Sequence, residues 1–272
     1  MAAVSALALE GVRFGYGAEP VLDGLTLRIE PGEGVALLGA NGAGKTTLTR
    51  LAMALRHPEA GSVRTAGRDT AGRRPEDLAD VAGYLFQHPE AQLFASTVRA
   101  EVAFGPERLG WAPSRVAAAV DAVLAELGLE AEADRHPYDL PTPFRRLVAL
   151  AAALVAGPTL LILDEPTAGL DRTSRARVVA TLAARRARGA ALLVVTHDLG
   201  FAAEVLDRAV LLEGRHAAFD GRLDHLLGRD PRYPAPPLVA LSRGLGMEPA
   251  LASVAALARR LTSAPETGTL QA

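Results

Sequence analysis

The segment GANGAGKTT at residues 39–47 decides how the rest of this sequence is interpreted. It has the spacing Gly-x4-Gly-Lys-Thr, follows a short apolar run at 35–38, and leads into a pattern with helical character up to about residue 55. A glycine-rich turn between a strand and a helix lets backbone N–H groups converge on phosphate oxygens at the positive end of the helix. Around a single lysine, this pattern arises by chance on the order of once in a thousand. The segment therefore predicts a phosphate-binding loop.

The lysine of this segment is unusual for this chain. Of the 29 basic residues, 28 are arginine and one is Lys45. A guanidinium is a poor substitute for a slim ammonium that must reach between phosphates. We expect Lys45 to reach the β and γ phosphates of ATP, and the Thr46 hydroxyl to hold Mg²⁺. The residues of the loop expected to bind the nucleotide are Gly39, Asn41, Gly42, Ala43, Gly44, Lys45, Thr46 and Thr47.

A second candidate element is LLILDE at residues 160–165. An apolar strand here delivers Asp164 to the carboxyl edge of a sheet, where it is expected to hold the metal through water. Glu165 beside it is placed to polarise the attacking water. Two adjacent carboxylates are often only part of a solvated loop. The following PT at 166–167 and GLD at 169–171, on a chain with a phosphate loop, favour the catalytic interpretation.

Three further side chains are weaker candidates. His197 follows a predicted strand at 191–195, where a parallel sheet gathers its ligands, although a lone histidine after a strand is more often structural. Gln87 ends a predicted strand and is placed to reach the metal or the water. Tyr16, between two glycines ahead of the loop, is placed to stack on adenine, although a packed surface tyrosine is a serious alternative.

The length and composition of the chain limit the classes of protein to which it can belong. The 272 residues allow one large α/β domain with a small appendage. A net charge of −2 gives no electrostatic case for nucleic acid, and the absence of cysteine excludes disulfides. Residues 1–13 lack a basic segment before an apolar core, so we expect no secretory signal. The apolar stretch 147–163 is broken by Gly157-Pro158, so we expect a helix, a turn and a strand rather than a membrane span.

The order of predicted elements indicates an α/β architecture. Strands that alternate with helices favour a mainly parallel sheet covered on both faces, and a helical block interrupts this alternation. The expected strands are 7–14, 25–29, 35–38, 61–67, 81–86, 160–163, 191–195, 209–212 and 216–219, and the expected helices are 116–127, 144–155, 174–188, 201–206 and 251–261. A Pro-rich stretch from residue 231 begins a small appended element, and residues 262–272 are expected to be disordered.

Taken together, the sequence resembles the ATPase domain of ABC transporters over roughly residues 5–222. The resemblance assigns roles to matching positions. Tyr16 matches the adenine-stacking aromatic, residues 39–47 match Walker A, and Gln87 matches the glutamine of the loop that contacts the membrane subunit. Asp164 and Glu165 match Walker B with its catalytic glutamate, Asp171 the D-loop aspartate, and His197 the switch histidine.

The resemblance implies a P-loop NTPase fold with a RecA-like, mainly parallel sheet, an antiparallel β edge and an inserted α-helical subdomain. The expected ATPase domain spans 1–222, with the core at 1–87 and 158–222 and the helical subdomain at 88–157. Residues 223–272 form a C-terminal extension, expected to be partly disordered. The catalytic set is Glu165, His197 and Gln87, and the metal set is Thr46, Gln87 and Asp164.

A narrower resemblance lies in FQHPEAQLFASTV at 86–98, continuing through VAFGP at 102–106. This is similar to the energising ATPases of energy-coupling factor (ECF) transporters and their cobalt and nickel relatives, which import vitamins or transition-metal ions. The tail from PPL at 236–238 onward is similar to the C-terminal extension of that group. The resemblance implies a transmembrane partner and a peripheral location on the cytoplasmic face of the cell membrane.

One element departs from the family pattern. Where the family has the signature Leu-Ser-Gly-Gly-Gln, this chain has LPTPF at 140–144. In the family, the signature of one subunit caps the γ-phosphate in the other subunit through a serine hydroxyl and backbone N–H groups. Neither Pro141 nor Pro143 has an N–H. We expect Thr142 to be the N-cap of the following helix and Pro143 its first residue. A heterodimer with a related ATPase that has a normal signature is therefore favoured.

Two other functions stay open at this point. A soluble ABC ATPase that acts in DNA repair or translation is disfavoured because no long coiled-coil insertion, second nucleotide domain or basic surface is evident. A regulatory subunit that binds ATP with weak hydrolysis is favoured by the altered signature, but Glu165 and His197 count against it. We expect an ATP-hydrolysing subunit that works as a dimer and drives import through a membrane partner. The transported substrate is not predicted.

Overall fold

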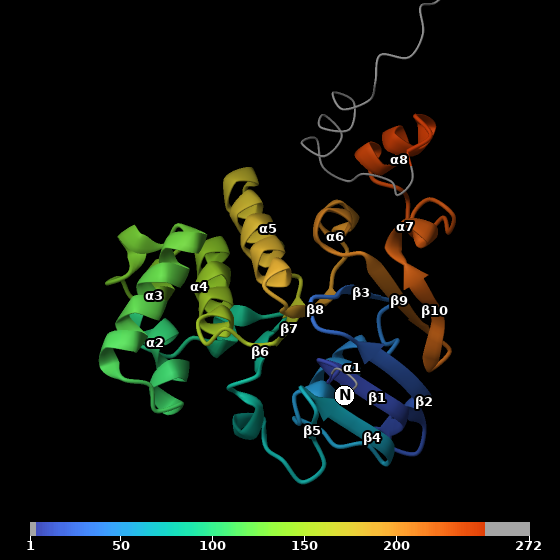
Figure 1. Cartoon of the computed structure of the whole chain (residues 1–272), viewed down its shortest axis with the longest axis horizontal. Coiled ribbons are helices and arrows are strands. Elements are labelled where there is room, and N and C mark those ends of the chain that lie inside the picture. Colours follow the sequence, from blue (N-terminus) through green and yellow to red (C-terminus); the bar gives the residue numbers. More distant parts are fainter. Residues whose placement is uncertain (1–3, 248–272) are drawn as a thin grey trace, which may run out of the picture.

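Two β-sheets and a set of helices form the part of the chain that the structure, a computed structural model, describes: residues 4–247 (Figure 1). An antiparallel sheet has the strand order β2-β1-β4-β5. Its strands are β1 (Leu7–Gly15), β2 (Pro20–Ile29), β4 (Ala60–Thr65) and β5 (Arg68–Asp69). Strand β4 is shorter than the predicted 61–67, because Ala66 and Gly67 adopt positive φ angles and turn the chain into β5.

The second sheet has the strand order β10-β9-β3-β8-β7-β6. All neighbouring pairs are parallel except β10 with β9. Its strands are β3 (Gly34–Leu38), β6 (Ala82–Leu85), β7 (Leu160–Asp164), β8 (Ala191–Val195), β9 (Arg208–Glu213) and β10 (His216–Arg222). The mainly parallel sheet, the antiparallel edge and the helices between β6 and β7 confirm the predicted fold class.

Helices cover the larger sheet and extend to one side of it (Figure 1). Helices α2, α3 and α4 lie between β6 and β7 in the chain and pack against one another. The α-helices are α1 (Lys45–Ala52), α2 (Val98–Arg108), α3 (Pro113–Leu127), α4 (Thr142–Leu154), α5 (Arg172–Ala187), α6 (Leu199–Val205), α7 (Leu223–Leu226) and α8 (Pro237–Gly244). Short 3₁₀ helices lie at η1 (Pro75–Leu78), η2 (Pro89–Gln92), η3 (Glu130–Glu132) and η4 (Pro137–Asp139).

The parallel strands β3, β7 and β8 are buried on both faces, as expected for the middle of a parallel sheet. In β3, Val35 and Leu37 join the core cluster that contains the antiparallel sheet and α1. Ala36 and Leu38 of the same strand join the cluster built with the other helices. The sheet is therefore the middle layer of the molecule, and its carboxyl edge lies between the two cores.

The predicted boundaries differ from the observed ones in a few places. Helix α5 begins two residues earlier than predicted, because the Asp171 carboxylate accepts a hydrogen bond of 2.7 Å from the N–H of Ser174 and caps the helix. The prediction that Thr142 is the N-cap of α4 is wrong. Pro141 occupies that position and Thr142 is the first helical residue. The predicted helix at 251–261 and the predicted disorder at 262–272 lie outside the described residues.

Residues 147–163 form the second half of α4, a turn and β7, as predicted. Among the residues that the structure describes, no helix is both long and apolar enough to cross a membrane.

Candidate functional site

The phosphate loop lies between the end of β3 and the start of α1. Gly39, Gly42 and Gly44 all have positive φ angles, of 146°, 82° and 100°. A Cβ on Gly39 would stand 2.6 Å from the carbonyl oxygen of Leu212, and one on Gly44 would stand 2.8 Å from the Leu22 side chain. Glycine is therefore required here both by the backbone conformation and by close packing.

The side chain of Lys45 is directed into the space that this loop surrounds. Its ammonium donates hydrogen bonds to the carbonyl oxygens of Gly39, at 2.7 Å, and Ala40, at 3.0 Å. Burial lowers the pKa of Lys45 from its ordinary value, and the carboxylates of Asp164 and Glu165 oppose this shift. A half-buried ammonium whose hydrogen bonds, within the described part of the chain, go to neutral carbonyls is suited to receive an anion.

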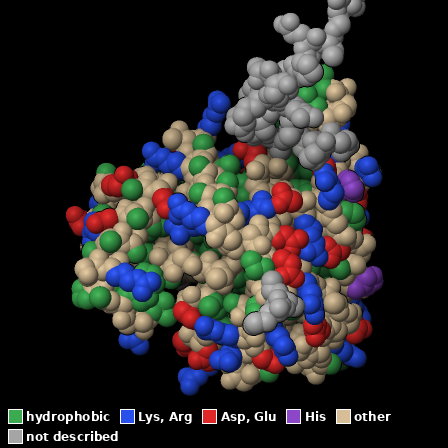
Figure 2. Space-filling model, in the orientation of Figure 1, with side chains coloured by type: hydrophobic (Ala, Val, Ile, Leu, Met, Phe, Trp, Pro, Cys, Tyr) green, Lys and Arg blue, Asp and Glu red, His purple; other side chains and the backbone are tan. Residues whose placement is uncertain are grey.

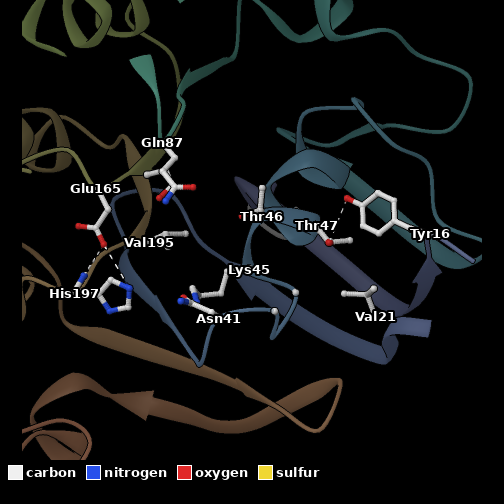
Figure 3. A pocket seen from close by; sticks show the side chains of 13 residues that line it. Tyr16, Val21, Asn41, Lys45, Thr46, Thr47, Gln87, Glu165, Val195 and His197 are labelled. Atoms are coloured by element: carbon white, nitrogen blue, oxygen red, sulfur yellow. Dashed lines mark hydrogen bonds and ion pairs between the residues drawn. The ribbon is translucent and has the colours of Figure 1, made fainter. Parts of the chain in front are cut away.

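The loop opens into a pocket of about 730 Å³ (Figure 3). Most of the predicted site residues line it together: Tyr16, Asn41, Gly42, Gly44, Lys45, Thr46, Thr47, Gln87, Asp164, Glu165 and His197. Two predicted residues do not. Gly39 and Ala43 each line a smaller neighbouring cavity, of about 210 and 470 Å³. Val21 and Val195 complete the wall, and as apolar residues they have no sequence signal for this role.

At one end of the pocket, Glu165 is held by the strand next to its own. Its carboxylate accepts hydrogen bonds from the His197 N–H, at 2.8 Å, and from the Thr196 hydroxyl, at 3.0 Å. The carbonyl oxygen of Glu165 accepts a bond of 2.8 Å from Arg146 of α4. Glu165 has a φ of 50°, which is uncommon for a residue with a side chain.

Asp164 is buried at the end of β7, directly before Glu165. Burial raises the pKa of Asp164, and the neighbouring Glu165 charge raises it further, whereas Lys45 and Arg146 oppose both effects. A buried carboxylate that disfavours its own charge is stabilised by a bound cation. In the described residues no group of three or more His, Cys, Asp and Glu side chains is suited to hold a metal. Thr46, Gln87 and Asp164 all line the pocket, and their side chains carry the oxygen donors that Mg²⁺ prefers.

Tyr16 lies at the other end of the pocket (Figure 3). The residue is 55% exposed, and its ring contacts Phe14 edge-on, with 5.1 Å between ring centroids. The Tyr16 hydroxyl accepts hydrogen bonds from Arg50, at 3.2 Å, and Thr47, at 3.5 Å. The ring is thus fixed through its hydroxyl while one face stays accessible.

Residues behind the pocket were not predicted from the sequence. The Asp198 carboxylate follows His197 and caps α6 by accepting a bond of 2.8 Å from the Phe201 N–H. It also accepts bonds from Arg175 of α5, at 3.2 Å, and from Thr167, at 3.3 Å. Asp198 therefore joins the segment after β7 to the segment after β8. Aspartate is a preferred N-cap residue, so Asp198 shortly before the predicted helix at 201–206 is a sequence signal for this cap.

The altered signature segment lies at the exposed start of α4. Pro141 and Thr142 are exposed, and the N–H groups of Phe144 and Arg145 both donate to the Pro141 carbonyl, at 2.9 and 3.1 Å. Pro143 has no N–H. The first turn of this helix therefore offers few donors to an anion.

Basic and acidic side chains are intermixed on the face that Figure 2 draws, over both the sheets and the helices. No single sign of charge dominates this face.

Comparison with known proteins identifies the family of this chain. Residues 22–168 match the family described as ABC transporter. The nickel import ATP-binding protein NikO of Rhodobacter capsulatus is 39% identical over 233 residues, which cover 82% of this chain and 92% of that protein. The cobalt import ATP-binding protein CbiO of Syntrophus aciditrophicus is 39% identical over 207 residues, covering 75% of this chain and 74% of that protein.

A solved structure resembles most of this arrangement. CbiO1 of Clostridium perfringens, part of the ABC transporter complex cbiONQ, superimposes with a TM-score of 0.73 and 27% sequence identity, over 82% of this chain and 90% of that one. A family match over more than half of the chain, together with a pocket built from the phosphate loop and the ends of β7 and β8, leaves one family. The chain belongs to the ABC transporter family and is an ATP-binding ATPase of that family.

Proposed function

We propose that this chain is the ATP-hydrolysing subunit of an importer of the ECF type, or of its nickel and cobalt relatives, and that it acts on a transmembrane partner from the cytoplasmic face of the membrane. The observation that carries the proposal is the single pocket shared by Lys45, Glu165 and His197. The relatives named above are a nickel import and a cobalt import ATP-binding protein, which supports the direction of transport and the class of cargo.

Residues at different places along this pocket bind different parts of ATP. Tyr16 stacks on adenine, and the loop amides with Lys45 bind the triphosphate. The amide nest and the Lys45 ammonium offer fixed positive charge to the β and γ phosphates. Glu165 orients a water molecule for in-line attack on the γ-phosphate, and His197 contacts that phosphate. Such positioning and charge neutralisation supply most of the catalysis in phosphoryl transfer.

Magnesium fits this donor set. Thr46, Gln87 and Asp164 would hold it, and Asp164 would gain a counter-charge that relieves the cost of its burial. When bound, the ion neutralises charge on the phosphate oxygens.

The division of the chain that we propose follows the elements. Residues 1–87 and 158–222 form the nucleotide core, residues 88–157 form the helical subdomain, and residues 223–272 form the C-terminal extension. Support comes from β6 and β7, which pair as neighbours in the sheet although the helices α2 to α4 separate them in the chain.

The surface proposed for the membrane partner lies where the helical subdomain joins the core. Phe94 and Phe104 are exposed and contact each other edge-on, with 4.8 Å between centroids. They line a groove of about 270 Å³. The buried carboxylate of Glu101 accepts bonds from the N–H groups of Phe94 and Ala95, at 2.9 and 2.7 Å, and so fixes this loop. Exposed aromatic pairs beside a groove are typical of protein interfaces.

We further propose a heterodimer in which a related ATPase supplies a normal signature. The few donors at the start of α4 support this arrangement. Purification of the tagged chain from membranes should yield a transmembrane subunit and a second ABC ATPase, and the complex should hydrolyse ATP faster than the chain alone. Recovery with ribosomes or DNA instead would contradict the transport function.

The signature can also be tested directly. Replacing Pro141→Ser, Pro143→Gly and Phe144→Gln together restores the hydroxyl and the N–H groups. If each regained charge-assisted bond contributes about 1.5–3 kcal/mol, the ATPase rate of the isolated chain should rise at least about tenfold. Strong ATPase activity of the unaltered chain alone would contradict the heterodimer and would favour a homodimer.

A further inference from the structure

The C-terminal extension returns to the phosphate loop. After α7 the chain forms a tight turn at 228–233, in which the Gly228 N–H donates to the Tyr233 carbonyl at 2.7 Å and the Tyr233 N–H to the Asp230 carbonyl at 2.9 Å. This turn brings Arg232 and Tyr233 to the wall of a cavity of about 210 Å³ that Lys45 and His197 also line. Lys45 and His197 also line the nucleotide pocket. The extension therefore lies next to the end of that pocket where the γ-phosphate is proposed to bind.

Arg232 connects the extension to the end of β9. Its guanidinium forms an ion pair with Glu213 through two N–O contacts, of 3.1 and 3.4 Å. It also forms an ion pair of 2.7 Å with Asp230 of its own turn. With two carboxylates beside it, Arg232 is already neutralised, which makes it a poor direct ligand for phosphate and a suitable anchor.

Glu213 directly follows Leu212, the residue of β9 that contacts the phosphate loop. The carbonyl of Leu212 approaches Gly39 so closely that a Cβ there would stand 2.6 Å from its oxygen. The end of β9 is therefore in direct contact with the first residue of the phosphate loop. Arg232 and Glu213 also line, with Ala40, a cavity of about 470 Å³ on the outer side of that loop.

The turn between β9 and β10 is held from its other side too. Arg215 forms an ion pair of 2.7 Å with Glu19, and its carbonyl accepts a bond of 3.0 Å from the Asp23 N–H. The antiparallel sheet thus holds one side of this turn, and the extension holds the other through Arg232. Removing the contacts of either Arg215 or Arg232 therefore leaves the end of β9 less firmly held behind the phosphate loop.

We propose that Arg232 positions the phosphate loop by fastening the C-terminal extension to Glu213. The extension thereby controls how tightly the site binds a nucleoside triphosphate, and a partner that displaces the extension would lower this affinity. The inference rests on the proposed nucleotide site but adds a residue that no Walker motif contains.

The test compares Arg232→Gln and Glu213→Gln in the full chain with the double variant. Exposed ion pairs contribute up to about 1 kcal/mol, which corresponds to about a fivefold change. We expect each single variant to bind magnesium-ATP about three- to fivefold more weakly than the unaltered chain. The double variant should bind it no more weakly than either single variant. Turnover at saturating ATP should not change, because neither residue touches the reacting atoms.

Arg28→Gln is the matched control, because the Arg28–Glu10 pair has similar exposure, 61% and 53%, against 53% and 54% for Arg232 and Glu213. It should leave ATP affinity unchanged. Unchanged affinity in Arg232→Gln, or additive losses in the double variant, would overturn the proposal. A fall in melting temperature without a fall in affinity would overturn it as well. If the unaltered chain itself fails to bind ATP, the proposed function fails instead, so the two failures are distinguishable.

Discussion

The carboxylate of Glu165 accepts a hydrogen bond of 2.8 Å from the backbone N–H of His197, although the two residues lie on neighbouring strand ends 32 positions apart. The imidazole Nε2 of His197 stands 3.9 Å from the same carboxylate oxygen and is 74% exposed, whereas the Glu165 side chain is only 19% exposed. The end of β8 therefore fixes the direction of the proposed base, while the imidazole remains accessible to a ligand in the pocket.

The first prediction concerns the role of Glu165. Glu165→Gln keeps the shape and the hydrogen-bond acceptor but removes the charge that polarises water, so turnover should fall by a factor of about 10²–10⁴. Affinity for ATP should stay within about twofold, because the phosphate contacts are intact. Single-turnover hydrolysis and ATP titration measure the two effects. Glu10→Gln, an exposed carboxylate of the antiparallel sheet, is the control. Unchanged turnover in Glu165→Gln would refute its role.

The second prediction separates adenine from phosphate recognition. Tyr16→Ala removes the stacking surface and should weaken ATP binding by about 1–3 kcal/mol, a typical range for aromatic stacking on a base. Affinity for inorganic tripolyphosphate should be unchanged, since that anion has no base to stack. Tyr16→Phe keeps the ring and serves as the matched control. Equal losses for ATP and tripolyphosphate would show that Tyr16 supports the loop rather than the base.

The third prediction concerns stability and pH through Asp198. Burial works to raise the pKa of Asp198, but the Phe201 N–H and the Arg175 guanidinium outweigh it and hold the pKa below its ordinary value. A carboxylate with a lowered pKa in the fold stabilises it above the unfolded pKa of about 3.9, and this contribution is lost as the pH falls through the folded value. Asp198→Ala should therefore lower the free energy of unfolding by about 1–2 kcal/mol at pH 7.

The difference between this variant and the unaltered chain should shrink as the pH falls below about 4. Urea titrations at several pH values measure it. Asp121→Ala, which breaks an exposed ion pair with Arg99, should cost about 0.5 kcal/mol or less. A pH-independent difference would mean that Asp198 acts through packing and not through its charge.

The parts of the site that can be predicted from the sequence are those whose residues lie close together in the chain. The phosphate loop is one continuous segment, and Asp164 with Glu165 directly follows an apolar strand, so spacing alone reveals both. The roles assigned to individual side chains remain predictions. Glycine at position 39 reflects a turn conformation, which sequence can suggest, and a close approach to Leu212, which it cannot.

The missed features depend on contacts between distant segments. Arg232 of the C-terminal extension forms an ion pair with Glu213 at the end of β9. Asp198, before α6, forms an ion pair with Arg175 of α5. Nothing in the sequence around these residues specifies such partners, because ion pairs of this kind arise wherever the fold brings opposite charges together. Pro143, which the sequence predicts as the first residue of α4, occupies the second position, because Thr142 is already helical and Pro141 precedes the helix.

The central claim is that Lys45 binds the triphosphate of ATP, and calorimetric titration of magnesium-ATP into the Glu165→Gln protein tests it most directly. In this variant binding is not obscured by hydrolysis. We predict a saturable site, with Lys45→Ala in the same background binding about 10- to 150-fold more weakly, because a charge-assisted bond contributes about 1.5–3 kcal/mol. Melting temperatures without nucleotide should match, which shows that the variant is folded. Absence of binding by the parent protein, or equal affinity with and without the Lys45 ammonium, would contradict the account.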